Sequence, residues 1–168
     1  MSGRILGLDP GIAVMGYGII EDSDGELTVV EYGGLFTTAR QGTPERLRIL
    51  YKGVIDLIDR HKPDAVAIEL FVARNLKTAL MVGQARGVAI LAAANKGLPV
   101  HEYTPLEVKQ KVSGYGRGEK RQVQEMVKMQ LGLGCIPEPD DAADALAVAI
   151  CHISEAHFAR LLARSSEK

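Results

Sequence analysis

The sequence contains only two cysteines, Cys135 and Cys151. Two thiols are too few for a disulfide framework, and their spacing is not that of a metal site. No run of 18 uninterrupted apolar residues is present, which argues against a transmembrane helix. The first residues lead directly into a short apolar segment and lack the long apolar core of a signal peptide. We therefore expect a cytoplasmic protein with reduced thiols and no membrane association.

The overall composition is ordinary for a globular protein, with 46% hydrophobic and 24% charged residues among 168. This length is enough for one domain with a sizeable core. We therefore expect residues 1–168 to form a single domain, with about the last six residues as a flexible tail.

The net charge of −1 conceals an asymmetry along the chain. Residues 74–128 contain ten Lys and Arg against four Asp and Glu, whereas the remainder contains ten against seventeen. Such a basic segment is typical of a protein that turns one face to phosphates. A chance run of solvated surface charge would explain the composition equally well.

Apolar patterns and turn residues predict the order of the secondary structure elements. Three strands at 4–9, 15–20 and 27–37 read as an antiparallel meander. Strands and helices then alternate, with helices at 43–62, 75–95, 105–112, 119–131 and about 140–162, and strands at 65–68 and 100–103. This order predicts an α/β domain in which helices cover a mixed sheet.

Two glycines, Gly83 and Gly87, lie one turn apart inside the predicted helix 75–95. Each costs about 1 kcal/mol in a helix interior, so such glycines usually mark the close approach of another backbone. That backbone could belong to the same chain or to a second subunit of a two-fold dimer.

Four acidic residues occupy notable positions. Asp9 and Glu69 end predicted strands, while Asp141 and Asp144 share one face of the first turn of the last helix. If they converge, they form a cage of hard oxygen ligands suited to Mg²⁺ or Mn²⁺. Two such ions would relieve the repulsion and support in-line phosphodiester hydrolysis. Taken singly, Asp9 could simply shape a turn, and Asp141 and Asp144 could simply cap a helix.

The sequence contains four ordered blocks, ILGLDPG at 5–11, GQARGVA at 83–89, VKQ at 108–110 and DAADALA at 141–147. Together these blocks resemble the RuvC family of Holliday-junction resolvases. The first block alone is shared with the wider ribonuclease H-like group, whereas the second block and the ordered set are specific. The resemblance extends from about residue 4 to about residue 153.

This resemblance implies a ribonuclease H-like fold with a mixed five-stranded sheet flanked by helices. It places Asp9, Glu69, Asp141 and Asp144 at the family's catalytic positions, where they would bind two Mg²⁺ ions per subunit, with Mn²⁺ as a substitute. It implies a homodimer that cuts two like-polarity strands of four-way junction DNA symmetrically and leaves 5′-phosphate and 3′-hydroxyl ends. It further implies a role in homologous recombination and DNA repair beside a branch-migration motor of the RuvA–RuvB type.

The family carries an aromatic residue three positions after the catalytic glutamate, where it stacks on a base near the crossover. Here Phe71 follows Glu69 by two positions, so the intervening segment departs from the family pattern. Phe71 is still the expected counterpart, because stacking tolerates differences in backbone detail. The alternative is a phenylalanine of the hydrophobic core.

Several basic residues are candidates for DNA contact. The resemblance places Lys109 and Lys120 among the family's DNA-contacting residues. Lys111, Arg117 and Arg121 lie around the glycine-rich stretch 114–118, which precedes a helix start as phosphate-binding loops do. The candidates that would extend this track are Arg74, Lys77 and Arg86. Solvated surface cations are the alternative for all of them.

Three other functions are compatible with parts of the sequence. A ribonuclease H-like nuclease acting on structured RNA would share the Asp-Pro-Gly of strand one, but not the GQARG block. A non-catalytic junction-binding protein would have no use for four carboxylates near phosphates. An actin-like phosphotransferase needs two lobes, for which 168 residues leave no room.

Overall fold

The computed structural model describes residues 2–71, 74–114, 116 and 118–166. Within them the strands are β1 (Ser2–Asp9), β2 (Val14–Ser23), β3 (Glu26–Phe36), β4 (Ala65–Glu69) and β5 (Val100–Tyr103). The helices are α1 (Thr43–His61), α2 (Leu76–Asn95), α3 (Pro105–Ser113), α4 (Lys120–Gln130) and α5 (Asp140–Ser166). All predicted elements are present. The largest difference is at α5, which continues to Ser166 where the sequence predicted an end near Leu162 and a tail beyond it.

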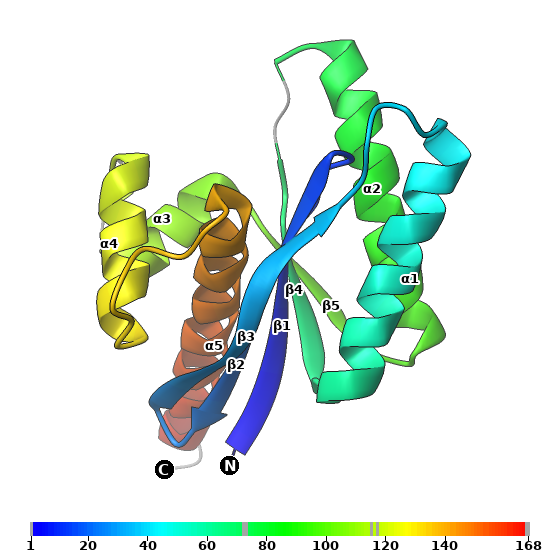
Figure 1. The fold of residues 1–168 in the computed structure, drawn as a ribbon. Helices are drawn as coiled ribbons and strands as arrows, with labels where there is room; N and C mark the ends of the chain where they lie inside the picture. Colours follow the sequence, from blue (N-terminus) through cyan, green and yellow to red (C-terminus); the bar gives the residue numbers. More distant parts are fainter. Residues whose placement is uncertain (1, 72–73, 115, 117, 167–168) are drawn as a thin grey trace.

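The five strands form one mixed sheet in the order β3-β2-β1-β4-β5 (Figure 1). Antiparallel pairing of β1 with β2 and of β2 with β3 confirms the predicted meander. Strands β1, β4 and β5 run parallel, with Leu8 opposite Ile68. Asp9 and Glu69, one residue further along each strand, therefore lie at the same edge of the sheet.

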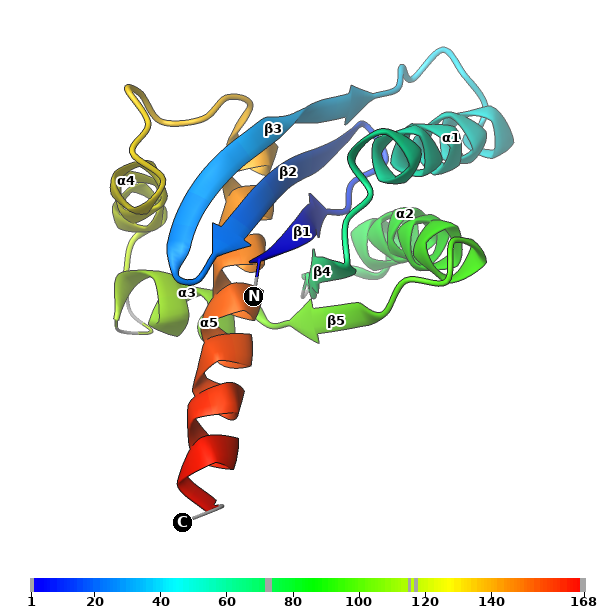
Figure 2. The same ribbon diagram turned by 90° about the horizontal axis from the view of Figure 1, so that it is seen from below.

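Helices cover both faces of the sheet (Figure 2). α1 and α2 bury one face through residues such as Leu50 and Ala89. α5, with α3 and α4 beside it, buries the other face through residues such as Leu146 and Val127. Apolar residues at helical spacing on α1 therefore mark a core face, as the sequence predicted.

Glycines let α5 approach the sheet unusually closely. A Cβ atom at Gly7 would lie 2.0 Å from the carbonyl oxygen of Ala145, and one at Gly16 would lie 2.0 Å from that of Asp141. Neither distance leaves room for a side chain. The start of α5 therefore rests directly on β1 and β2, beside the end of β1.

The glycines of α2 are in a different environment. A Cβ atom at Gly83 or Gly87 would meet nothing within 4 Å, so the intrachain explanation of this pair is wrong. Leu76, Leu80 and Leu91 on the same helix are also exposed.

Two helices, α2 and α5, are long and apolar enough to cross a membrane by length and composition alone. Both of them pack on the sheet instead, α2 through its buried alanines.

Candidate active site

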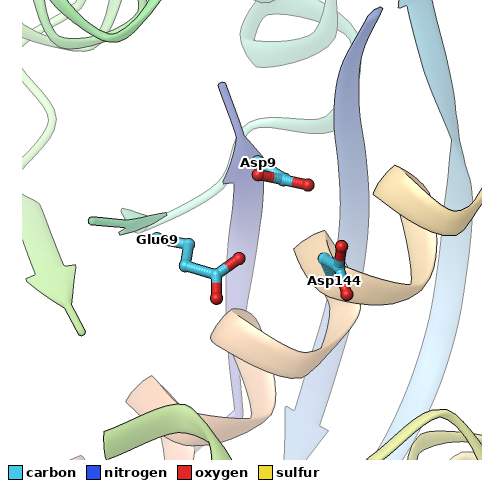
Figure 3. A group of neighbouring side chains, drawn as sticks. All are labelled: Asp9, Glu69 and Asp144. Carbon is cyan, nitrogen blue, oxygen red and sulfur yellow. The ribbon is translucent and has the colours of Figure 1, made fainter. Parts of the chain in front are cut away.

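Three of the four predicted acids meet at one edge of the sheet. Asp9 projects from the end of β1, Glu69 from the end of β4 and Asp144 from the first turns of α5 (Figure 3). One carboxylate oxygen from each lies within 4.8 Å of the others. Residues far apart in sequence are brought together because β1 and β4 are parallel neighbours and α5 begins against them.

Asp141 lies outside this group of three but faces the same space. It lines a cavity of about 510 Å³ together with Asp9, Glu69 and Asp144. Its charge also contributes to raising the pKa of Asp9. The four carboxylates thus line one cavity.

Burial and neighbouring negative charge raise the pKa values of the acids in this cavity. Burial raises the pKa of Asp9 to about 9, and the charges of Glu69, Asp144 and Asp141 add to the effect. Burial, followed by the charge of Asp144, raises the pKa of Glu69 to about 7. Burial also raises the pKa of Asp144, although nearby Lys120 opposes the shift. Without a cation, this centre therefore retains protons that isolated carboxyl groups would have lost.

The donor set fits hard divalent cations. All four candidate ligands are carboxylates, which suit Mg²⁺ or Mn²⁺ better than a soft metal. Burial, and after it the neighbouring negative charges, raise the pKa values of Asp9 and Glu69, and a bound divalent cation would favour the ionised carboxylates. Among the described residues, this is the one group of three or more such side chains close enough to hold an ion.

Two lysines border the same cavity. Lys109 of α3 lines it, and its charge lowers the pKa of Glu69. Lys120 of α4 lies with its Nζ atom 3.8 Å from Oδ2 of Asp144 and 3.2 Å from Oδ2 of Asp140. Burial lowers the pKa of Lys120, but these carboxylates outweigh it and hold the pKa above its ordinary value.

Asp140, the first residue of α5, is a further acid at this site that was not among the four predicted ones. The structure shows that it anchors Lys120 and also accepts a hydrogen bond from Nε2 of Gln124 at 3.3 Å. The sequence signal was its position four residues before Asp144, which places both acids on one helix face.

Phe71 lies directly beside the acids. Its side chain is 50% exposed and lines the cavity, so the core explanation is wrong. The one-residue difference from the family pattern still leaves an aromatic ring next to Glu69. This position allows contact with a base near the reacting phosphate.

Among the residues that the structure describes, the other basic candidates are not part of the lining of this cavity. Nζ of Lys111 is 2.8 Å from Glu155 on α5 and 5.4 Å from the centre of the Phe158 ring. Arg86 is paired with Glu102 of β5. Both cations are thus engaged within the chain.

Arg74 and Lys77 are exposed just before and at the start of α2, near the edge that carries the acids. Arg121 is also exposed, with its guanidinium 3.2 Å from Glu125. Arg117 lies outside the described residues. Of the described basic candidates, Lys109 and Lys120 are therefore the two that line the cavity of the acids.

A family model described as "Crossover junction endodeoxyribonuclease RuvC" matches residues 5–152. The chain belongs to the RuvC family. A protein of that name from Chloroflexus aurantiacus is 59% identical over 150 residues, which cover 89% of this chain and 92% of the relative. Another, from Desulfitobacterium hafniense, is 56% identical over 161 residues, which cover 95% and 96%.

Solved structures support the same assignment for this RuvC-family chain. "T. thermophilus RuvC in complex with Holliday junction substrate" superposes with a TM-score of 0.89 at 33% identity, covering 94% of this chain and 96% of that one. The yeast mitochondrial Holliday junction resolvase Ydc2 shares the fold, with a TM-score of 0.62 at 14% identity over 90% and 79%. The predicted ribonuclease H-like fold is confirmed. Membership of a family that acts on DNA also makes the chain a soluble rather than a membrane protein.

Proposed function

We propose that this chain resolves Holliday junctions by nicking two strands of like polarity symmetrically, leaving 5′-phosphate and 3′-hydroxyl ends in homologous recombination and DNA repair. The observation that carries the proposal is the carboxylate group of Asp9, Glu69 and Asp144 at one sheet edge, with oxygens within 4.8 Å. It stands in a chain whose matched relatives are crossover junction endodeoxyribonucleases.

Asp9, Glu69, Asp141 and Asp144 would hold two Mg²⁺ ions per subunit, with Mn²⁺ able to substitute. Bound there, such ions would activate the attacking water and stabilise the leaving oxygen of an in-line displacement. The carboxylates must be ionised to bind them, so the raised pKa values of Asp9 and Glu69 make metal binding favoured by higher pH.

Side chains around the acids would position the DNA. Lys109 and Lys120 line the cavity and supply positive charge next to a phosphate backbone. Phe71 presents an exposed ring at the same cavity and would stack on a base at the crossover. Arg74 and Lys77 would extend this contact along the edge toward α2, with Lys111, Arg86, Arg117 and Arg121 as weaker candidates.

The active form would be a homodimer joined through α2. Leu76 and Leu80 are 75% and 59% exposed, and beside them Gly83 and Gly87 leave room for another backbone. A second copy of the same helix would bury these side chains by two-fold symmetry. Two active sites related by a two-fold axis suit two symmetric cuts.

This dimer would act in the cytoplasm beside a branch-migration motor of the RuvA–RuvB type. The family resemblance supports this partnership, because a junction must be moved to a cleavable position before it is cut.

The deciding experiment is incubation with a synthetic mobile four-way junction and Mg²⁺. We expect paired nicks at symmetric positions from the parent protein and none from Asp9→Asn, which keeps the side-chain size and removes one negative ligand. Structured RNA of similar size serves as the competing substrate. Preferential cleavage of that RNA, or equal activity of Asp9→Asn, would rule the proposal out.

A further inference from the structure

A second cationic surface lies outside the basic segment 74–128. Residues 37–52 contain Arg40, Arg46, Arg48 and Lys52 against one acid, Glu45, within a remainder of the chain that is otherwise acidic. This stretch includes the connection from β3 to α1 and the first half of α1. We propose that this surface, the β3–α1 groove, binds the phosphate backbone of a junction arm next to the active site.

The groove has a defined shape. A hollow of about 560 Å³ is lined by Leu35 and Phe36 of β3 and by Arg48, Lys52 and Asp56 of α1. Phe36 is 61% exposed at the end of its strand. Arg48, Lys52 and Asp56 follow one another at intervals of four residues, so they form one row on α1, about 6 Å apart.

The cations lie at the end of this row that is closer to the acids. α1 starts next to the end of β3 and runs back along the sheet, so Arg48 and Lys52 come before Asp56 (Figure 1). The sheet register also links the two places, because Asp9 is opposite Gly16, Gly16 is opposite Gly34, and Phe36 follows two residues later. Asp56, the single acid of this row, therefore lies at the end farther from Asp9.

The distance matches the dimensions of a DNA arm. Two strand spacings of about 4.8 Å and two residues of about 3.4 Å place the backbone of Phe36 about 12 Å from that of Asp9. One DNA strand advances about 3.4 Å per nucleotide. A duplex that crosses this edge of the sheet with its reacting phosphate at the acids would therefore reach the level of Phe36, on the side of α1, about three to four base pairs away.

The cations of the groove are available to phosphates. Arg48 is 70% exposed, and its pair with Glu45 at 2.8 Å is a surface pair of the kind that contributes little to stability. Arg40 and Lys52 are exposed and form no ion pair with another residue in the described part of the chain. Arg46 is fixed by a 2.8 Å hydrogen bond from its Nε to Thr37 Oγ1, which orders the connection.

The test compares single charge removals at the two ends of α1. Arg48→Gln and Lys52→Gln each remove a groove cation, and Lys62→Gln removes an exposed cation from the opposite end of the helix. Affinity for a labelled four-way junction is measured across a salt series, with Ca²⁺ replacing Mg²⁺ to slow hydrolysis. We expect Kd to rise about five- to eightfold at 0.1 M salt for each groove variant, and the salt slope to fall by about 0.9. Lys62→Gln should match the parent protein.

A second experiment locates the contact on the DNA. Neutral methylphosphonates placed three to four base pairs from the crossover should weaken binding by the parent protein, but not by the Arg48→Gln/Lys52→Gln double variant. An unchanged Kd and salt slope in the double variant would overturn the inference. So would loss of the dimer in sedimentation, because the groove would then be a protein interface.

The inference rests on the proposed function, and the two fail differently. If the parent protein shows no preference for four-way DNA over a simple duplex, the resolvase proposal itself fails. If the parent is selective and the groove variants bind identically, the resolvase proposal stands and only the groove assignment is lost.

Discussion

The two longest helices, α2 and α5, are both rich in apolar residues, yet they meet the sheet in different ways. α5 buries residues on every side from Ala142 to Ile153, because Gly7 and Gly16 let it lie directly on the strands. α2 buries mainly a row of alanines and leaves Leu76, Leu80 and Leu91 exposed. The chain thus buries the first half of α5 internally and leaves one face of α2 exposed.

This difference separates two roles. The buried start of α5 fixes Asp141 and Asp144 against Asp9, so the carboxylate group depends on intrachain packing. The exposed face of α2 contributes nothing to that group and is free to join subunits. Even α5 changes along its length, because its second half projects from the body and exposes Phe158, Leu161 and Leu162 (Figure 2).

The largest effect should follow a change at the buried start of α5. Asp144→Asn removes one ligand charge without changing side-chain size, and we expect junction cleavage to fall about 1,000-fold or more, as the loss of a metal ligand would cause. Circular dichroism and thermal melting should show an intact fold. Cleavage within tenfold of the parent would mean that Asp144 is not part of the catalytic centre.

A change beneath the helix should have the next largest effect. In Gly16→Ala the new methyl group would collide with the carbonyl group of Asp141, so α5 must shift. We expect about 100-fold slower cleavage and a loss of about 1–3 kcal/mol in the free energy of unfolding, measured by urea denaturation. Gly134→Ala is the matched control, because its Cβ would meet nothing within 4 Å. Equal behaviour of both variants would contradict the close packing of α5.

The packing of α5 also predicts how stability depends on pH. The folded protein holds protons on Asp9, whose pKa is raised to about 9, and on Glu69, whose pKa is raised to about 7, whereas the unfolded chain releases them near pH 4. The metal-free protein should therefore become less stable as the pH rises from 5 to 8, with Asp9 alone contributing up to about 4 kcal/mol, because each pH unit corresponds to about 1.4 kcal/mol.

Chemical denaturation in a chelator at several pH values measures this slope. Asp9→Asn should flatten it, because the group with the most strongly raised pKa is gone. Excess Mg²⁺ should reduce or reverse it in the parent protein, since the ionised carboxylates bind the cation. A parent protein whose metal-free stability rises over this range would show that the acids are not crowded.

The same contrast explains what sequence alone could predict. Asp9 and Glu69 were predictable because each ends an apolar strand, and parallel neighbours place their ends together. Asp144 was predicted through the family resemblance and not from a local pattern, because its approach to the strands depends on Gly7 and Gly16 admitting α5. Arg86 was interpreted as a DNA contact, but the fold places Glu102 of β5 beside it. Such pairings between distant elements depend on tertiary packing, which periodicity does not encode.

The smallest effect should separate the two exposed apolar surfaces. Leu80→Glu places a charge on the exposed face of α2, and Leu161→Glu makes the same change on the projecting half of α5. The two leucines are similarly exposed, Leu80 at 59% and Leu161 at 61%. If α2 joins the subunits, Leu80→Glu should raise the dimer dissociation constant about tenfold or more, because a buried charge must be desolvated. Leu161→Glu should leave it unchanged. Sedimentation equilibrium measures both, and a dimer disrupted only by Leu161→Glu would move the interface to α5 and leave the exposed leucines of α2 without a role.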